Sequence, residues 1–309
     1  MEYTRLGSTG TTVSQLCYGT WRFGRETGGV VETDREQAHE LLDAAWERGI
    51  NFFDTANVYG TPNGKSERYI GEWLDDRDRE DVVIASKVYF PFDGWGEPGP
   101  NDSGLGRKHI RAQIAGTLDR LDTDYLDLYY IHRWDEESNV VETLRTLNDL
   151  VREGTVHYLG ASTMAADYLD VAADQDMAVC PYSPLAGGFL TGKYERTDDD
   201  DPTKFEGPDG ARGSLSDRFD DFYLSERGWH VLDEIKTVAD ELDATPPQVA
   251  LRWLIEQPDI TCVPIVGART VDQLDENVGA TDISLSDDQF NRIVSARYAD
   301  DGERWGHRE

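Results

Sequence analysis

Hydrophobic and polar positions along the chain fall into two alternating patterns. Short apolar runs rich in β-branched and aromatic residues, such as Ile50–Phe53, are typical of buried strands. Longer segments such as Asp34–Arg48 repeat their apolar positions every three or four residues, which is typical of amphipathic helices. The regular alternation of the two patterns predicts a parallel sheet wrapped by helices.

The pattern places most elements without ambiguity. Strands of the sheet are predicted at Leu16–Gly19, Ile50–Phe53, Val82–Ser86, Leu126–Ile131, Val156–Gly160, Ala178–Tyr182 and Thr261–Val266. Helices are predicted at Asp34–Arg48, Ser66–Leu74, Arg107–Leu121, Val140–Arg152, Ser225–Leu242, Pro246–Glu256, Val271–Val278 and Asp287–Arg297. A hairpin of Tyr3–Leu6 and Val13–Ser14 is expected before the first of these strands. No repeat or second domain stands out, so residues 1–309 are expected to form a single barrel domain.

Four polar residues follow the ends of three strands of the predicted sheet. Asp54 and Tyr59 come after Ile50–Phe53, whereas Lys87 and His132 each come directly after a later strand. Because the carboxyl ends of parallel strands converge on the face of a barrel where its chemistry occurs, these side chains are expected to meet.

The four side chains together would form a proton donor. A free phenol has a pKa near 10, and an ammonium beside it favours the phenolate and so lowers that pKa. We therefore expect Tyr59 to be the general acid, with Lys87 adjusting its pKa and Asp54 holding Lys87. His132 would orient a carbonyl or relay a proton. The alternative is a structural ion pair of Lys87 and Asp54, with Tyr59 and His132 merely half-buried beside it.

Several motifs in this order resemble the aldo-keto reductase family. The matching stretches are Gly19-Thr20-Trp21, Gly49 to Gly60 with Asp54-Thr55-Ala56 and Tyr59, Gly64-Lys65-Ser66-Glu67, Ser86-Lys87, Tyr130-Ile131-His132, Gly160-Ala161-Ser162, Tyr182 to Gly188, and Pro264 to Arg269. The resemblance implies an α/β fold of the TIM-type (β/α)8 barrel class and NADP(H)-dependent interconversion of carbonyls and alcohols. It assigns the same catalytic roles to Asp54, Tyr59, Lys87 and His132.

The resemblance also implies a cofactor site spread over the later strands. Tyr182 would stack on the nicotinamide, followed by a loop of small residues whose backbone amides are expected to be free for the pyrophosphate. The implied cofactor-binding residues are Ser162, Thr163, Tyr182, Ser183, Pro184, Leu185, Gly187, Lys193, Gly267, Arg269, Gln273, Glu276 and Asn277. Thr163 stands where the family usually has Asn. NADP(H) is the expected cofactor because a helix start with a nearby Arg suits a 2′-phosphate; NAD(H) is the alternative.

Aromatic residues after the strand ends are candidates for the wall of a hydrophobic substrate pocket. They are Trp21, Tyr89, Trp95 and Trp134, with Phe90 beside Tyr89. For each of them, simple loop packing is the alternative.

Composition narrows the choice of partners. The chain carries 61 acidic and 30 basic residues, a formal charge of −31, and only 6 of its basic residues are Lys. Nucleic acid and anionic membranes are not expected to bind such a surface. An excess of acid with few Lys suggests a protein of high-salt cells, where screening limits self-repulsion; an ordinary acidic protein is the alternative. The partner expected is a small carbonyl compound, and the pattern indicates no oligomeric state.

The cysteines and the N-terminus suggest a cytoplasmic protein. Cys17, Cys180 and Cys262 lie in apolar runs, and their spacing indicates neither a metal site nor a disulfide framework. We find no signal peptide at the start and no apolar run long enough to span a membrane.

One departure from the family pattern lies between Ser162 and Cys180. The family has a further strand and helix there, whereas Met164–Met177 leaves room for one short helix. One βα unit, roughly 30 residues in a standard barrel, is therefore expected to be missing. A seven-stranded or gapped barrel, a neighbouring chain filling the gap, and residues lost from the recorded sequence are the alternatives.

The sequence therefore predicts an NADP(H)-dependent oxidoreductase that reduces an aldehyde or ketone, with Tyr59 as the general acid. Two alternatives stay open. One is an NADP(H)-binding regulatory subunit resembling the β subunits of potassium channels. The other is a remnant inactivated by the missing unit.

Overall fold

The computed structural model describes residues 1–92, 99–164, 168–198, 200–208, 219 and 223–297. The chain forms two compact units. The first consists of Met1–Gln15, Leu169–Val266 and Asp272–Glu309, and the second of Leu16–Tyr168 and Gly267–Val271.

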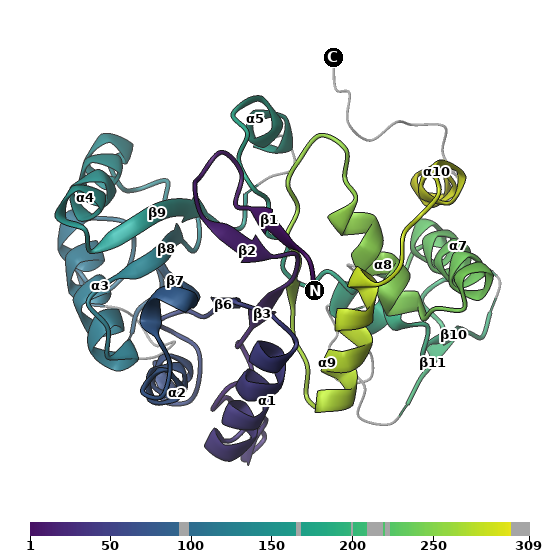
Figure 1. Cartoon of the computed structure of the whole chain (residues 1–309), viewed down its shortest axis with the longest axis horizontal. Coiled ribbons are helices and arrows are strands. Elements are labelled where there is room, and N and C mark those ends of the chain that lie inside the picture. Colours follow the sequence, from purple (N-terminus) through teal and green to yellow (C-terminus); the bar gives the residue numbers. More distant parts are fainter. Residues whose placement is uncertain (93–98, 165–167, 199, 209–218, 220–222, 298–309) are drawn as a thin grey trace. The chain divides into compact units, whose positions relative to one another are not determined.

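A parallel sheet forms the centre of the second unit. Its strands are β3 (Cys17–Gly19), β6 (Phe52–Asp54), β7 (Val83–Val88), β8 (Leu126–Ile131) and β9 (Val156–Ala161). They lie side by side in chain order, each parallel to the next (Figure 1). All residues of β6 and β7 are buried, as expected of strands covered on both faces. The strand ends of β6, β7 and β8 consequently meet on one edge.

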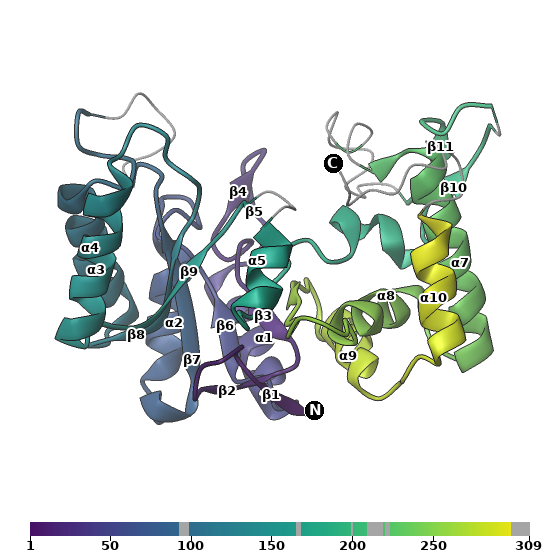
Figure 2. The ribbon, with the colours of Figure 1, turned by 90° about the horizontal axis from the view of Figure 1, so that it is seen from above.

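Four helices separate these strands along the chain and follow one another around the sheet (Figures 1 and 2). They are α1 (Arg35–Glu47), α2 (Lys65–Leu74), α3 (Arg107–Leu121) and α4 (Val140–Glu153), and each contacts the next. Their ends follow from local chemistry. Asp34 caps α1 by accepting a hydrogen bond from the amide of Gln37, and Gly154 ends α4 in the left-handed conformation.

Short elements outside the main pattern complete the second unit. A small hairpin of β4 (Glu26–Thr27) and β5 (Val30–Val31) follows β3, and the 3-10 turn η1 (Arg79–Asp81) precedes β7. The sequence pattern did not predict the hairpin, because two-residue strands are too short to show an alternation.

The first unit contains the N-terminal hairpin and the end of the barrel pattern. The hairpin pairs β1 (Tyr3–Arg5) with β2 (Thr12–Ser14), as predicted. In place of the predicted strands Ala178–Tyr182 and Thr261–Val266, isolated parallel bridges pair Val179 with Cys262 and Tyr182 with Ile265. Ile265 also begins the short strand β12 (Ile265–Val266). Cys17 and Cys262 are buried, whereas Cys180 is only half-buried, and none of the three forms a disulfide.

The helices of the first unit agree closely with the predicted ones. They are α7 (Glu226–Leu242), α8 (Pro246–Ile255), α9 (Val271–Val278) and α10 (Asp287–Ala296), with the turn η4 (Gly279–Thr281) after α9. Thr245 and Gln248 form a capping box at the start of α8, where Pro246 occupies the first position.

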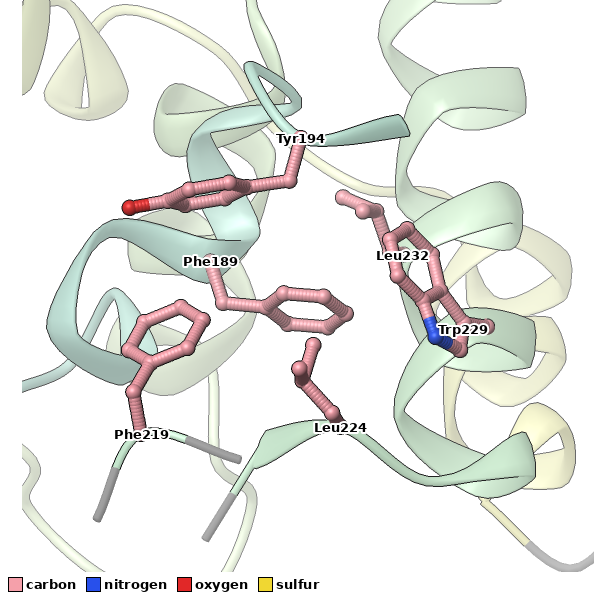
Figure 3. Packing of buried hydrophobic residues seen from close by; sticks show 6 residues of the cluster. All are labelled: Phe189, Tyr194, Phe219, Leu224, Trp229 and Leu232. Carbon is pink, nitrogen blue, oxygen red and sulfur yellow. The ribbon is translucent and has the colours of Figure 1, made fainter. Parts of the chain in front are cut away.

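An aromatic cluster fixes the loop region before α7 (Figure 3). Phe189 comes from the 3-10 turn η2 (Ala186–Thr191), and its ring lies 5.0 Å from that of Trp229 on α7. The hairpin of β10 (Glu195–Arg196) and β11 (Phe205–Glu206) adds Phe205 to this core. The cluster members are Phe189, Tyr194, Phe219, Leu224, Trp229 and Leu232. This segment, which includes the acidic residues Asp198, Asp200 and Asp201, therefore contains a hairpin that packs on buried aromatics through Phe205.

The segment where a βα unit was expected to be missing holds a single short helix. Between Ser162 and Ala178, the described residues form α5 (Tyr168–Asp174) and no strand. On the described part of the chain, no helix is long and apolar enough to cross a membrane.

Candidate active site

The structure brings the four strand-end residues together in the second unit. Asp54 is the last residue of β6, and Tyr59 lies in the turn that follows it. Lys87 is the penultimate residue of the neighbouring strand β7, whereas His132 directly follows β8. The parallel register pairs Asp54 with Ala85 and Lys87 with Tyr130, so the carboxyl ends of the three strands bring the four side chains to one edge of the sheet.

Lys87 is the centre of the cluster. Its Nζ donates to Asp54 Oδ1 at 2.5 Å, to the carbonyl oxygen of Thr55 at 2.8 Å and to Tyr59 Oη at 3.3 Å. An ammonium has three donors, so its whole hydrogen-bonding capacity is directed at these atoms. Lys87 and Asp54 are each only 4% exposed, which makes this a buried ion pair with a phenol attached.

Charge pairing keeps the lysine protonated. Burial by itself would lower the pKa of Lys87, but Asp54 and Tyr59 outweigh burial and raise it to about 12. Burial raises the pKa of Asp54, and the Lys87 ammonium counters that rise. Asp54 Oδ2 is buried and has no hydrogen-bond partner among the described residues, so Lys87 is the main group that compensates this carboxylate.

The pKa of Tyr59 differs from the sequence-based expectation. Burial raises it above its usual value of 10, and Lys87 only partly opposes that rise. The expectation of a net lowering was wrong because it considered the ammonium and neglected the loss of water around the phenol. Tyr59 consequently stays protonated at neutral pH, which is the form that can donate a proton.

His132 lies edge-on to two aromatic rings. Its ring centroid is 5.9 Å from that of Tyr59 and 5.1 Å from that of Phe90. Burial, with a smaller contribution from the Lys87 charge, lowers the pKa of His132 from 6.5 to about 3. The imidazole is therefore neutral at physiological pH and can donate a hydrogen bond from one nitrogen only. Its Nδ1 is buried without a partner among the described residues.

Gly60 allows the turn that carries Tyr59. Its φ of +101° is open to glycine, and a Cβ added there would lie 2.5 Å from the Cβ of Lys65. Any other residue would push α2 away from the turn and displace the phenol.

The aromatic residues expected to line a substrate pocket differ in their contacts and exposure. Phe90 contacts His132 and Tyr89, with the two aromatic rings of Tyr89 and Phe90 5.0 Å apart. Trp21 is 39% exposed and carries the Arg25 guanidinium 3.8 Å from its ring centroid, so part of its face is already covered. Trp134 is 44% exposed, and Trp95 lies outside the described residues.

The predicted cofactor residues divide between the two units. Ser162 and Thr163 belong to the second unit, directly after β9. The Thr163 hydroxyl donates to the carbonyl oxygen of His132 at 3.1 Å, and Thr163 has a positive φ of 57°. Thr163 therefore fixes the backbone of His132, a contact that the sequence did not predict.

The loop expected to take the pyrophosphate lies in the first unit, from Ser183 to Gly192. Tyr182 before it is 63% exposed. The expectation of free amides was wrong in part: the amide of Ala186 donates to Ser183 and that of Gly188 to Leu185. A Cβ on Gly188 would lie 2.9 Å from Lys193 Nζ, so this glycine lets the ammonium approach the loop backbone. Pro184 and Gly187 lie within the same loop, which Phe189 anchors through the cluster of Figure 3.

The residues expected to bind the 2′-phosphate of the cofactor lie at Gly267–Arg269 and at the start of α9. Gly267 and Arg269 are exposed, and the carbonyl oxygen of Arg269 accepts a hydrogen bond from the Gln37 side chain at 2.8 Å. On α9, Gln273 is exposed and Glu276 half-buried, whereas Asn277 is only 4% exposed. Among the described residues, no group of His, Cys, Asp and Glu is arranged to hold a metal ion.

Sequence reasoning did not single out the residues that hold the cluster in place. Ser66 and Glu67, both fully buried on α2, are hydrogen-bonded to residues next to Asp54 and Lys87. Both residues belong to the motif Gly64-Lys65-Ser66-Glu67, but the sequence of this motif does not indicate which residues they bond to.

Comparison with known proteins identifies the family. The family model described as "Aldo/keto reductase family" matches residues 15–174 and 163–297. The chain belongs to the aldo/keto reductase family. An aldo/keto reductase of this class has a TIM-type (β/α)8 barrel, and the parallel strands alternating with helices agree with that fold.

Three relatives show how broad the similarity is. The chain is 34% identical to "Uncharacterized oxidoreductase YrpG" of Bacillus subtilis, covering 96% of this chain and 95% of the relative. It is 32% identical to "Probable voltage-gated potassium channel subunit beta" of Oryza sativa subsp. japonica, covering 92% of each. It is 33% identical to "Norsolorinic acid reductase B" of Aspergillus parasiticus, covering 94% of this chain and 82% of the relative.

The lengths of these alignments bear on the missing unit. They span 334, 321 and 329 positions, more than the 309 residues of the whole chain. Gaps must therefore fall on this aldo/keto reductase in each comparison. The two family matches also overlap at residues 163–174, where the described residues include α5 and no strand. Both observations agree with the expectation that about one βα unit is absent there.

Proposed function

We propose that this protein is an NADP(H)-dependent carbonyl reductase that converts an aldehyde or ketone into an alcohol. The observation that carries the proposal is the contact of Lys87 Nζ with both Asp54 and Tyr59 Oη in a buried cluster. A protonated phenol beside a fixed positive charge can give its proton to a carbonyl oxygen and leave a stabilised phenolate.

Each residue of the cluster has a distinct part in this reaction. Tyr59 donates the proton, while Lys87 stabilises the phenolate that remains. Asp54 keeps Lys87 charged and in place. His132, neutral at physiological pH, donates a hydrogen bond that orients the substrate carbonyl. The aromatic rings of Phe90 and Tyr89 make the wall beside His132 apolar, which suits a hydrophobic substrate.

The nicotinamide cofactor supplies the hydride when it is bound. The residues that fit it are the exposed Tyr182 for the nicotinamide ring, the Ser183–Gly192 loop with Lys193 for the pyrophosphate, and Arg269 for a 2′-phosphate. The family generally uses NADP(H), and Arg269 supports the same preference here.

The test compares two tyrosine variants of the purified full-length protein in molar KCl. NADPH oxidation is followed with a panel of aliphatic and aromatic aldehydes and ketones. The variant Tyr59→Phe is expected to lower kcat by about 10²- to 10⁴-fold, the usual contribution of general acid catalysis, with little change in the Kd of NADPH. Tyr125→Phe is the matched control, because Tyr125 directly precedes β8, at the opposite end of that strand from His132, and its hydroxyl donates to the backbone oxygen of Arg79 at 3.4 Å. An unimpaired Tyr59→Phe enzyme would refute the proposed role of the phenol.

A second candidate function is a nucleotide-binding regulatory subunit. It is favoured by the 32% identity to a protein named as a probable potassium channel β subunit. Tight NADPH binding without turnover of any carbonyl, together with a membrane protein that co-purifies, would support this candidate over the reductase.

A further inference from the structure

Two buried polar side chains at the start of α2 reach the strand ends that carry the catalytic cluster. Ser66 and Glu67 are both fully buried, and they follow Gly64 and Lys65 in the helix start. Buried polar side chains are costly unless they are hydrogen-bonded, so their partners show what they stabilise.

The Ser66 hydroxyl joins three segments around the end of β6. Its Oγ lies 2.7 Å from Thr20 Oγ1 and 2.9 Å from Thr55 Oγ1. Thr20 Oγ1 in turn donates to the carbonyl oxygen of Asp54 at 2.9 Å. The backbone amide of Ser66 donates to the carbonyl oxygen of Tyr59 at 3.2 Å. Ser66 is thus hydrogen-bonded to the backbone of Tyr59 and, through the two threonines, to the residues around Asp54.

The Thr55 link has a direct consequence for the lysine. The carbonyl oxygen of Thr55 accepts one of the three hydrogen bonds of Lys87 Nζ, at 2.8 Å. A shift of Thr55 therefore moves one of the three atoms that aim the ammonium.

Glu67 performs the equivalent task at β7. Its Oε1 accepts a hydrogen bond from Ser86 Oγ at 2.7 Å, and Ser86 directly precedes Lys87 in the strand. Its Oε2 accepts from Arg120 Nε on α3 at 2.6 Å, which neutralises the buried carboxylate. The side chain of Arg120 is 6% exposed, and its guanidinium lies 4.2 Å from the ring centroid of Phe92.

Gly64 makes room for this arrangement. Its φ is +83°, and a Cβ there would lie 2.5 Å from Cδ of Arg120. The motif Gly64-Lys65-Ser66-Glu67 therefore has a physical basis at each end: a glycine that lets Arg120 approach, and two polar residues that bond to the strand ends.

We propose that the first turn of α2 is a positioning element of the active site, in which Ser66 and Glu67 hold Thr55 and Ser86 so that Lys87 faces Tyr59. The proposal rests on the proposed reductase function, because it concerns the same proton-donating cluster. The two residues touch neither the phenol nor the substrate carbonyl, and they act through the placement of Lys87.

The cluster is sensitive to such placement. The contact between Lys87 Nζ and Tyr59 Oη is 3.3 Å, longer than the other two contacts of the ammonium. In a site shielded from water, the interaction of charges changes steeply with distance. Loosening either anchor should therefore weaken the stabilisation of the phenolate before it unfolds the protein.

The experiment uses Ser66→Ala and Ser86→Ala in the full-length protein with bound NADPH. Each removes one hydroxyl from the anchors and leaves Glu67 and Arg120 paired, so neither creates an uncompensated buried charge. Thr146→Ala is the matched control, because Thr146 is also fully buried but bonds to the carbonyl oxygen of Glu142 in its own helix α4. For all variants, kcat, the KM of the aldehyde and the Kd of NADPH are measured. The pKa of Tyr59 is followed by NMR of ¹³C-labelled tyrosine, with Tyr59→Phe assigning the resonance.

We expect both serine variants to lose about tenfold in kcat, a part of the usual effect of a general acid, at unchanged KM and Kd. We also expect the Tyr59 resonance to titrate at a higher pH than in the wild type, because Lys87 opposes the rise of that pKa less well. Wild-type kcat and wild-type titration in both variants would overturn the proposal, as would an equal loss in Thr146→Ala. If the wild type turns over no carbonyl, the proposed function fails, and the Tyr59 titration still decides the role of Ser66 and Ser86.

Discussion

Burial and charge act in opposite directions on each residue of the cluster, and their balance sets its protonation. For Lys87 the charge partners prevail, whereas for Tyr59 and His132 burial prevails. The result is a cluster of a charged ammonium, a protonated phenol and a neutral imidazole. This state requires no proton to be supplied or removed before a carbonyl binds at neutral pH.

His132 makes the stability of the fold depend on pH. Its pKa is about 3 in the folded protein and 6.5 in a free side chain, so the unfolded chain binds a proton first as pH falls. The free energy of unfolding should therefore decrease between pH 6.5 and about 3, by about 1 kcal/mol for each pH unit on account of this residue alone.

Urea unfolding of the wild type and of His132→Gln at several pH values measures this contribution. The many carboxylates titrate in both proteins, so the difference between the two curves isolates His132. The exposed His157→Gln serves as the control, and it should follow the wild type. Parallel curves for wild type and His132→Gln would contradict the assignment of a buried neutral imidazole.

At the scale of elements, long periodic segments were predictable and short irregular ones were not. The helices predicted at Asp34–Arg48 and Val140–Arg152 correspond to α1 and α4, and each bound agrees within one residue. The spacing of apolar residues and the cap residues indicate the same helix bounds there. The β4–β5 and β10–β11 hairpins were missed because two-residue strands leave no periodic signal.

The candidate site shows the same division. The identity of Asp54, Tyr59, Lys87 and His132 could be inferred because each ends or follows an apolar strand run. The net pKa of Tyr59 could not, because it depends on how much water the folded chain removes. The anchors Ser66 and Glu67 were also missed, since their partners Thr55 and Ser86 are distant in sequence and meet them only in the folded unit.

The start of α9 leads to a prediction about cofactor choice. If Arg269 binds the 2′-phosphate, then Arg269→Gln should raise the KM of NADPH about ten- to hundredfold, the worth of one or two charge-assisted hydrogen bonds. The KM of NADH, which lacks that phosphate, should change little. Steady-state kinetics with both cofactors measures this, with the exposed Arg145→Gln on α4 as a charge-matched control. An equal rise in the KM of NADPH and of NADH would show that Arg269 does not bind the 2′-phosphate.

At the scale of the whole molecule, the charge of −31 is the dominant feature. Ion pairs such as those of Arg292 with Glu234 and Glu241 reduce repulsion locally but leave this net charge unchanged. We propose that the protein is adapted to high salt, where the Debye length falls from about 10 Å at 0.1 M to about 3 Å at 1 M and self-repulsion is screened.

Thermal unfolding in KCl tests this adaptation. The midpoint should rise as KCl increases from about 0.1 M to about 1 M, because screening relieves repulsion more than it weakens the surface ion pairs. The control is a neutral sugar at the same osmolality as the KCl, which measures general solute effects. A midpoint that is constant or falls with KCl would refute the high-salt proposal.

The expected absence of a βα unit is the second feature of the whole molecule. The alignments are longer than the chain, and the described residues between Ser162 and Ala178 contain only α5. The proposed catalytic cluster comes from strands β6 to β8 and the turns that follow them, before this gap, and all three hydrogen bonds of Lys87 Nζ are made within this part of the chain. We therefore expect the shortened barrel to retain the proton-donating half of the reaction.

We propose that this chain reduces a carbonyl with hydride from the nicotinamide and a proton from Tyr59. The decisive experiment incubates an aldehyde with NADPH that carries deuterium on both faces of C4 and analyses the product by mass spectrometry. The wild type is expected to form an alcohol with one deuterium on the carbinol carbon, and Tyr59→Phe almost none. Unlabelled alcohol, or no alcohol from a folded wild-type protein that binds NADPH, would contradict it.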